Sequence, residues 1–379
     1  ALRAWTMMLA MIAFSMSMVG TFLVRSGILT SVHSFAVDPR RGTFILVLLA
    51  LYVGAAFLLF ALRTGKLKEG ERFELVSRES ALVVNNLLLT VILGIVFFGT
   101  LYPLLVEAAT GGKLSVGPPY FNSVAGPLAL LLAALVAVGP LLAWRRASRP
   151  IGKRLTIPAL LAATALAVSL FAAPEIGWLP RLGFVVAAWL APASLLPLIA
   201  RNPLRTPLAT WGMAVAHLGV AVAIAGMASD SAFTRERLAA ARLGETLNVG
   251  PWLIRLQAVS PAVGPNWTAL EAELRASRGD GVLVLRPQTR FFTDPPTETN
   301  EAAIDTMLGG QLYTVLGKPD GQGRWQLRLW WKPFVTLIWL GGVLIALGGL
   351  LALGGRAWRA TRSRRRPREE RPWHKERYA

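Results

Sequence analysis

Long apolar runs separated by short polar loops dominate this sequence. We place eight such runs at residues 4–23, 43–62, 81–105, 124–144, 155–173, 182–200, 208–228 and 334–353. A helix of about 20 apolar residues crosses the roughly 30 Å hydrocarbon core of a bilayer, and a soluble core rarely needs one. The pattern therefore predicts a polytopic α-helical membrane protein with about eight transmembrane helices.

Residues 229–333 follow another pattern, in which polar and apolar positions alternate. Segments such as WLIRLQAV, GVLVLRP and RWQLRLWW have the two-residue period of half-buried strands, and RGDG and KPDGQG are turn signals between such strands. We expect a small β-rich domain, either a barrel or a sandwich. The predicted organisation is seven helices in 1–228, the β-domain in 229–333, an eighth helix in 334–353 and a basic tail in 354–379. We see no heptad array.

The basic residues give the orientation. The net charge is +19, and ten of the 40 lysines and arginines lie after the last apolar run. Most of the others flank apolar runs and concentrate in 63–80, 144–154 and 201–207. Because cytoplasmic loops are rich in Lys and Arg, both chain ends are predicted to be cytoplasmic and the β-domain to lie outside. The charge thus indicates lipid headgroups rather than nucleic acid as a partner.

The sequence excludes several kinds of chemistry. It contains no cysteine, so it has no disulfide and no thiolate metal site. Nothing in it resembles a nucleophile triad, a phosphate loop or a catalytic carboxylate pair, so any reaction must run through a cofactor. Because the chain starts at Ala1 and not at Met, we expect a fragment or a processed piece.

The seventh run contains the first candidate ligand, His217. It lies in TWGMAVAHLGVAVAIAG, about nine residues from either end of the predicted helix and therefore near the membrane midplane. An ionisable side chain at that depth is usually functional or paired within a bundle. Gly212 and Gly219 would let a flat macrocycle or another helix approach closely. Two interpretations stay open: a metal ligand, with haem iron a common choice, or a neutral histidine hydrogen-bonded to a neighbouring helix.

The first outer loop contains the second candidate, His33, in LVRSGILTSVHSF. Arg25, Arg40 and Arg41 lie in the same loop, against the general charge bias. Arginine matches a carboxylate with a two-pronged donor set, so these residues suit an anion such as a haem propionate. The alternative is ordinary headgroup contact with a solvated histidine. His374, in the basic tail, is expected to be a solvated surface residue.

Two aromatic segments are also noted. VGPPYFN, residues 116–122, is either a rigid rim for a ligand or partner, or a simple turn at the membrane interface. LWWKPF, residues 329–334, is expected to be an interfacial tryptophan anchor before the last helix.

Several of these motifs resemble those of the cytochrome c maturation haem lyase family, the CcmF type. The segments that carry the resemblance occur in the family's order and span roughly 1–360: GTFLVRSGILTSVHSFAVDPRRGTFIL, NNLLLTVILGIVFFGTLYPLL, KLSVGPPYFN, AVAHLGVAVAIAG and KPFVTLIWLGGVLIALGGLLAL. The resemblance implies a multi-pass protein of the bacterial inner membrane with a periplasmic outer domain. Such a protein takes haem from a haem chaperone. It joins the haem by thioether bonds to Cys-X-X-Cys-His of an apocytochrome c, which a thiol-reducing delivery protein supplies.

The resemblance also implies roles for the histidines. His33 would ligate the external substrate haem and count as its catalytic residue, with Arg25, Arg40 and Arg41 near the propionates. His217 would ligate an internal b-type haem that keeps the substrate haem reduced. The family's tryptophan-rich WWD segment and the second axial ligands are absent from this chain. The chain therefore resembles a carboxyl-terminal portion, either truncated or one half of a split lyase whose amino-terminal half is separate.

The main alternative from the residues alone is a proton-coupled transporter or channel subunit with a functional buried histidine, and a second is a structural scaffold. No inverted repeat supports a transporter. The sequence does not indicate which cytochromes are served, the electron donor to the internal haem, the oligomeric state or whether haem is bound in this piece.

Overall fold

The computed structural model describes residues 3–26, 38–66, 74–112, 114–144, 151–199 and 201–365. The chain divides into two compact units. The first contains residues 1–135 and 141–149, and the second contains 136–140 and 150–379. Each unit is described by itself.

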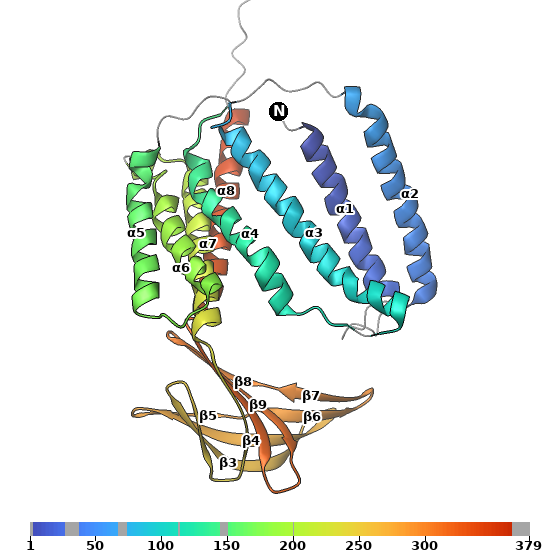
Figure 1. Cartoon of the computed structure of the whole chain (residues 1–379), viewed down its shortest axis with the longest axis vertical. Coiled ribbons are helices and arrows are strands. Elements are labelled where there is room, and N and C mark those ends of the chain that lie inside the picture. Colours follow the sequence, from blue (N-terminus) through green and yellow to red (C-terminus); the bar gives the residue numbers. More distant parts are fainter. Residues whose placement is uncertain are drawn as a thin grey trace, which may run out of the picture. The chain divides into compact units, whose positions relative to one another are not determined.

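The first unit consists of four long helices (Figure 1). They are α1 (Arg3–Ser26), α2 (Pro39–Arg63), α3 (Arg78–Thr110) and α4 (Pro118–Val138), and short 3-10 turns follow at Thr64–Lys66 and Gly139–Leu141. The helices α1 and α2 pack against each other as a hairpin. Pro103 lies within α3 and Pro127 within α4. Membrane helices tolerate internal proline where neighbouring groups satisfy the freed carbonyl.

The second unit holds four further helices. They are α5 (Gly152–Phe171), α6 (Trp178–Leu195), α7 (Leu208–Phe233) and α8 (Thr336–Arg365), with a 3-10 turn at Pro203–Arg205. The helix α7 packs on α6 and on α8. Within the described residues, eight helices are long and apolar enough to cross a membrane. This confirms the predicted number of spans.

A seam of glycines joins α7 to α8. Glycine recurs every seventh residue on both helices, at Gly212, Gly219 and Gly226 and at Gly341, Gly348 and Gly355. A Cβ added to Gly219 would lie 2.7 Å from the carbonyl oxygen of Gly341, and one added to Gly226 would lie 2.6 Å from the backbone nitrogen of Ile338. The two backbones therefore touch along antiparallel helices. The seven-residue spacing belongs to small residues that permit close approach, and not to the large apolar residues of a coiled-coil heptad array.

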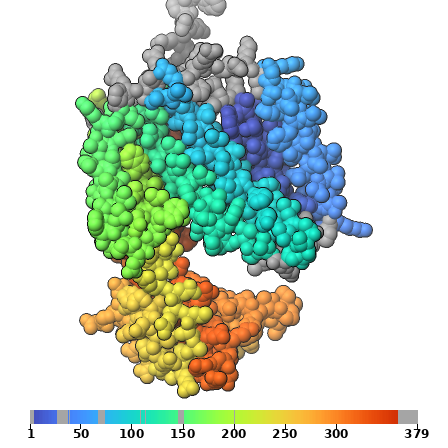
Figure 2. Space-filling model, in the orientation of Figure 1, coloured from blue at the N-terminus to red at the C-terminus, as the bar shows by residue number. Residues whose placement is uncertain are grey.

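Residues 235–333 form ten strands, all of them described. They are β1 (Arg235–Ala241), β2 (Thr246–Val249), β3 (Trp252–Val263), β4 (Trp267–Arg278), β5 (Gly281–Leu285), β6 (Gln288–Thr293), β7 (Pro296–Glu301), β8 (Ala303–Met307), β9 (Gly310–Pro319) and β10 (Trp325–Pro333). One antiparallel sheet has the order β1-β10-β9-β8. The other has the order β2-β3-β4-β6-β7, with β5 also paired to β4. The β-domain is thus a sandwich rather than a barrel, and its strands form one continuous body in Figure 2.

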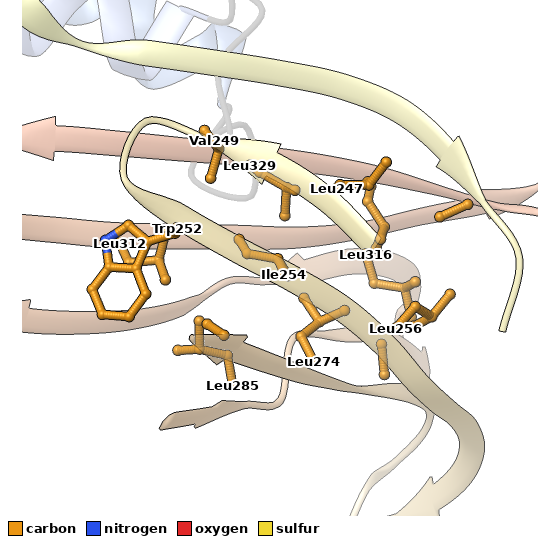
Figure 3. Packing of buried hydrophobic residues seen from close by; sticks show 14 of the residues in the cluster. Leu247, Val249, Trp252, Ile254, Leu256, Leu274, Leu285, Leu312, Leu316 and Leu329 are labelled. Carbon is orange, nitrogen blue, oxygen red and sulfur yellow. The ribbon is translucent and has the colours of Figure 1, made fainter. Parts of the chain in front are cut away.

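The core of the sandwich lies between the two sheets (Figure 3). Ile254 and Leu256 of β3 are buried, and the residues between and beside them are exposed. Leu312 and Leu316 of β9 face them from the other sheet. The two-residue alternation seen in the sequence is therefore the alternation between core and solvent, as expected for antiparallel sheets with one wet face.

Trp331 corrects one sequence expectation. Only 7% of its surface is exposed, and its ring centroid lies 6.1 Å from that of Trp252 in the sandwich core. Its neighbour Trp330 points to the other face of the sheet, where it packs on Tyr313 at 5.0 Å. Trp331 is thus a core residue and not an interfacial anchor, because strand β10 continues through this position before α8 begins.

The sandwich is tied to α7 and α8 where the chain passes between them. The hydroxyl of Ser229, in the last turns of α7, donates to the carbonyl of Pro333 at 3.0 Å. The ammonium of Lys332 lies 3.3 Å from the carboxylate of Asp230. Both contacts join residues that are about 100 positions apart in the sequence. The start and the end of the sandwich therefore lie together, where α7 ends and α8 begins.

Candidate functional site

The end of the α1–α2 hairpin that flanks residues 27–37 holds three of the predicted site residues. Arg25 is in the last turn of α1, and its carbonyl accepts from the backbone N–H of Asp38 at 2.9 Å. Gly42 of α2 lies so close to α1 that an added Cβ would be 2.8 Å from the Cα of Ser26. Backbone contacts thus hold together the two helix ends that flank residues 27–37.

Asp38 is a functional residue that the sequence interpretation missed. Its carboxylate caps α2 by accepting from the backbone N–H of Arg41 at 3.1 Å, and it forms an ion pair with the Arg41 guanidinium at 3.3 Å. The signal was present, because aspartate followed by proline is a common start of a helix. Arg41 is therefore engaged by its own helix cap, although an exposed pair of this kind adds little stability.

The other two arginines are free of such pairing within the described ranges. Neither the half-buried Arg25 nor the exposed Arg40 forms a side-chain ion pair or hydrogen bond there. They remain available for an anion at this end of the hairpin. His33 lies outside the described residues, so its predicted role stays a prediction.

His217 lies on the face of α7 that packs on α6. Residues four, seven and eleven positions further along, Ala221, Ile224 and Ala228, share this face and are buried. A Cβ added to Gly183 of α6 would lie 2.9 Å from the Cβ of Ala228. The imidazole itself is half-buried, and it forms no hydrogen bond with any residue in the part of the chain that the structure describes.

The depth of His217 differs from the expected one. The helix α7 runs to Phe233 and not to residue 228, so His217 is the tenth of its 26 residues. At about 1.5 Å per residue, it lies only about 5 Å from the centre of the helix, on the Leu208 side. The helix is longer than predicted because the polar residues of its last two turns, Ser229 and Asp230, find partners at the end of β10.

The two glycines beside His217 serve the helix seam. A Cβ on Gly212 would clash with the carbonyl of Gly348, and one on Gly219 would lie 2.8 Å from the backbone nitrogen of Ile345. Of the two uses that the sequence left open for these glycines, the structure shows close approach of another helix. His217 lies on a different face from this seam, so the imidazole is not covered by α8.

The donor set at His217 suits a ligand that takes one side chain per face. The described residues contain no group of three or more His, Asp or Glu side chains that would hold a metal ion. A porphyrin iron needs only one axial donor from each side, and neutral imidazole is a usual one. Half-burial and the lack of a hydrogen-bond partner among the described residues fit an imidazole of this kind.

A pocket opens at the end of α3 and α4, where VGPPYFN lies. Its volume is about 390 Å³, and its wall is mostly apolar. It is lined by Phe98, Gly99, Tyr102, Leu114, Ser115, Val116, Gly117, Pro119 and Tyr120. Gly99 permits this arrangement, because a Cβ there would lie 3.0 Å from the ring of Phe121. Of the two interpretations of this segment, the pocket favours a ligand rim.

Comparison with known proteins gives consistent matches along the chain. Residues 232–333, which are the sandwich, match the family described as CcmF C-terminal beta-sandwich. The chain is 40% identical over 379 aligned residues to the cytochrome c-type biogenesis protein CycK of Bradyrhizobium diazoefficiens, covering 95% of this chain and 57% of that protein. It is 38% identical over 356 residues to CcmF of Escherichia coli, covering 93% of this chain and 55% of that protein.

A solved structure gives the same result. The structure titled Cytochrome c Heme Lyase CcmF superposes with a TM-score of 0.70 at 27% sequence identity, over 93% of this chain and 55% of that chain. The chain therefore spans little more than half the length of the relatives it matches.

Proposed function

The chain belongs to the CcmF-type family of cytochrome c biogenesis proteins and corresponds to its carboxyl-terminal portion, and on this premise we propose that it is part of a haem lyase. The lyase attaches haem by thioether bonds to Cys-X-X-Cys-His of an apocytochrome c. Because the chain spans 55–57% of its relatives, the remaining parts of the activity are supplied by protein outside this chain. The observation that carries the proposal is the half-buried imidazole of His217 within a membrane helix, which forms no hydrogen bond with the described residues.

His217 would hold an internal b-type haem from one side, and a second holding residue would come from outside this chain. Such a haem would supply one-electron transfer rather than oxygen binding. The chain's own contribution is placement. The α7–α8 seam fixes one side of α7, and the contact of Ala228 with Gly183 fixes the side toward α6. These contacts involve backbone atoms and a methyl group rather than long, flexible side chains. They therefore fix the rotation of α7 about its axis, and with it the direction in which His217 points.

The outer end of the α1–α2 hairpin receives the substrate haem. His33 ligates it, and Arg25 and Arg40 bind its propionates. A guanidinium without a partner among the described residues breaks no existing bond when it donates to a carboxylate. Arg25 and Arg40 are therefore better suited to this role than Arg41. Arg41 stays with Asp38 and keeps the helix end in place.

The charge distribution supports the orientation that we propose, and the family supports the choice of membrane. The protein lies in the bacterial inner membrane with both ends of the chain cytoplasmic and the sandwich in the periplasm, where apocytochromes c are assembled. The sandwich and the pocket beside VGPPYFN are the docking surfaces we propose for the haem chaperone and for the apocytochrome with its delivery protein. Loss of residues 235–325 without loss of cytochrome c assembly would dispose of the docking role of the sandwich.

Absorption spectroscopy of the chain purified from membranes together with the part of the lyase that supplies the second ligand tests the proposal. His217→Ala is expected to remove the Soret band of the internal haem, whereas Leu218→Ala, on the adjacent helix face, keeps it. His33→Ala is expected to stop release of holocytochrome c while the internal haem remains. Wild-type haem content in the His217 variant would refute the assignment, and a colourless wild-type protein would favour the transporter or scaffold interpretation.

A further inference from the structure

The turn between β8 and β9 presents Leu308 without any cover. Its side chain is 98% exposed, the highest value among the large apolar residues of the described ranges. A single exposed leucine on a protein surface is ordinary and needs no explanation. The position of this one in the fold is what gives it meaning.

Backbone contacts tie this turn to the first residues of α8. The N–H of Phe334 donates to the carbonyl of Gly309 at 2.9 Å, and the hydroxyl of Thr336 donates to the carbonyl of Leu308 at 3.4 Å. Gly310 is so close to the same segment that an added Cβ would lie 2.8 Å from the Cα of Pro333. Because the membrane-spanning part of α8 starts at Thr336, the turn lies at the edge of the bilayer.

The backbone at the junction is held in an unusual conformation. Phe334 has φ of 55°, the only positive φ of a non-glycine residue in the described part of the chain. An L residue rarely adopts this conformation, so the surrounding contacts must maintain it. This conformation points the Phe334 N–H toward the carbonyl of Gly309, and Phe334 remains 51% exposed beside the turn.

The surroundings of the turn suit lipid. Trp339, in the second turn of α8, is 69% exposed, and tryptophan is favoured where a helix meets the headgroup region. Lys332 at the end of β10 and Asp230 near the end of α7 form an ion pair at 3.3 Å. Leu308, Phe334 and Trp339 thus extend the apolar surface of α8 outward onto the sandwich.

We propose that the β8–β9 turn inserts Leu308 into the adjacent membrane leaflet, so that lipid is the partner of this surface and the sandwich has a third attachment to the bilayer besides α7 and α8. The proposal is independent of haem binding. It rests on the continuity of the turn with the exposed apolar surface of α8, and on the hydrogen bonds from Phe334 and Thr336 that hold the turn at the start of that helix. A sandwich attached in this way is restrained from rocking about its two connections to the helices.

Site-directed fluorescence gives a direct test, because the chain contains no cysteine of its own. An environment-sensitive fluorophore is attached to Leu308→Cys, and in a second sample to Gln322→Cys, in protein reconstituted into phosphatidylcholine vesicles. Gln322 is in the turn at the other end of β9, which at about 3.3 Å per residue is roughly 30 Å further along the strand. It serves as the exposed control.

The expected result is a blue-shifted emission at position 308, with several-fold stronger quenching by nitroxide-labelled lipid and several-fold weaker quenching by aqueous iodide than at position 322. Equal behaviour at the two positions would overturn the proposal. Protection of position 308 from both quenchers would also overturn it, because protein and not lipid would then cover the turn.

An unlabelled variant provides a second readout. Leu308→Asp is expected to raise the hydrogen-exchange rate of the β8–β9 turn several-fold in vesicles, since a carboxylate is driven out of the leaflet. Exchange within β3 and β4 should not change. Leu243→Asp, at an exposed leucine in the turn between β1 and β2, is the matched control. An unchanged exchange rate in the Leu308 variant would show that the turn already lies in water.

Discussion

Two adjacent glycines of α8 allow a sharp test of the helix seam. A Cβ added to Gly348 would lie 2.5 Å from the backbone nitrogen of Ala216 and 2.7 Å from its Cβ, whereas a Cβ added to Gly349 meets nothing within 4 Å. Gly348→Ala therefore pushes α8 away from α7 next to His217. Gly349→Ala adds the same methyl group in open space.

The comparison isolates packing from backbone entropy. Each Gly→Ala change favours the helix by roughly 0.5–1 kcal/mol, and this gain is the same at both positions. Overpacking a closely fitted interface costs about 1–3 kcal/mol. We therefore expect Gly348→Ala to be less stable than Gly349→Ala by about 1–3 kcal/mol, with Gly349→Ala equal to the wild type or slightly more stable.

Reversible unfolding in mixed micelles, followed by tryptophan fluorescence, measures the difference in the free energy of unfolding. Haem-loaded protein gives a second readout under the proposal that His217 binds haem, because a displaced α7 should then shift the Soret band. If the two variants unfold at the same point, the backbones of α7 and α8 are not in contact, and the account of how His217 is positioned fails with them.

Three further changes follow from the same contacts. Asp38→Ala removes the cap of α2 and the partner of Arg41, and should lower the free energy of unfolding by about 0.5–2 kcal/mol; Asp38→Asn, which keeps the cap, should lose much less in the same micelle assay. Leu256→Ala creates a cavity in the sandwich core, where the leucine is fully buried, and should cost about 2–5 kcal/mol in a denaturant titration, whereas a change of less than 1 kcal/mol would contradict its place in the core. The backbone N–H of Gln322 donates to Asp320 and lowers the pKa of this carboxyl below its ordinary 3.8. The contribution of this turn to stability is therefore full above pH 3.8 and is lost as the pH falls through the lowered pKa. Asp320→Asn should flatten this part of an acid titration of stability, and an unchanged slope would contradict the assignment.

The sequence by itself determined the two kinds of structure in this chain. The apolar runs predicted eight membrane helices because the length of a hydrophobic segment is a local property that a bilayer selects directly. The two-residue alternation in 229–333 predicted a β-domain for a similar reason, since it reflects the two faces of each strand. His217 stood out because an imidazole within an apolar run is visible without any knowledge of its neighbours.

Tertiary structure decided what these residues face. Gly212 and Gly219 allow α8 to approach closely, and Trp331 packs in a core that also contains Trp252. Arg41 forms an ion pair with the carboxylate of Asp38. Each of these contacts joins positions whose pairing depends on how separate elements pack, and no local period records which element a face will meet. The sequence pattern thus predicted the elements and singled out His217. The packing of α6, α7 and α8 decided that the imidazole lies on the α6 side of α7 and away from α8.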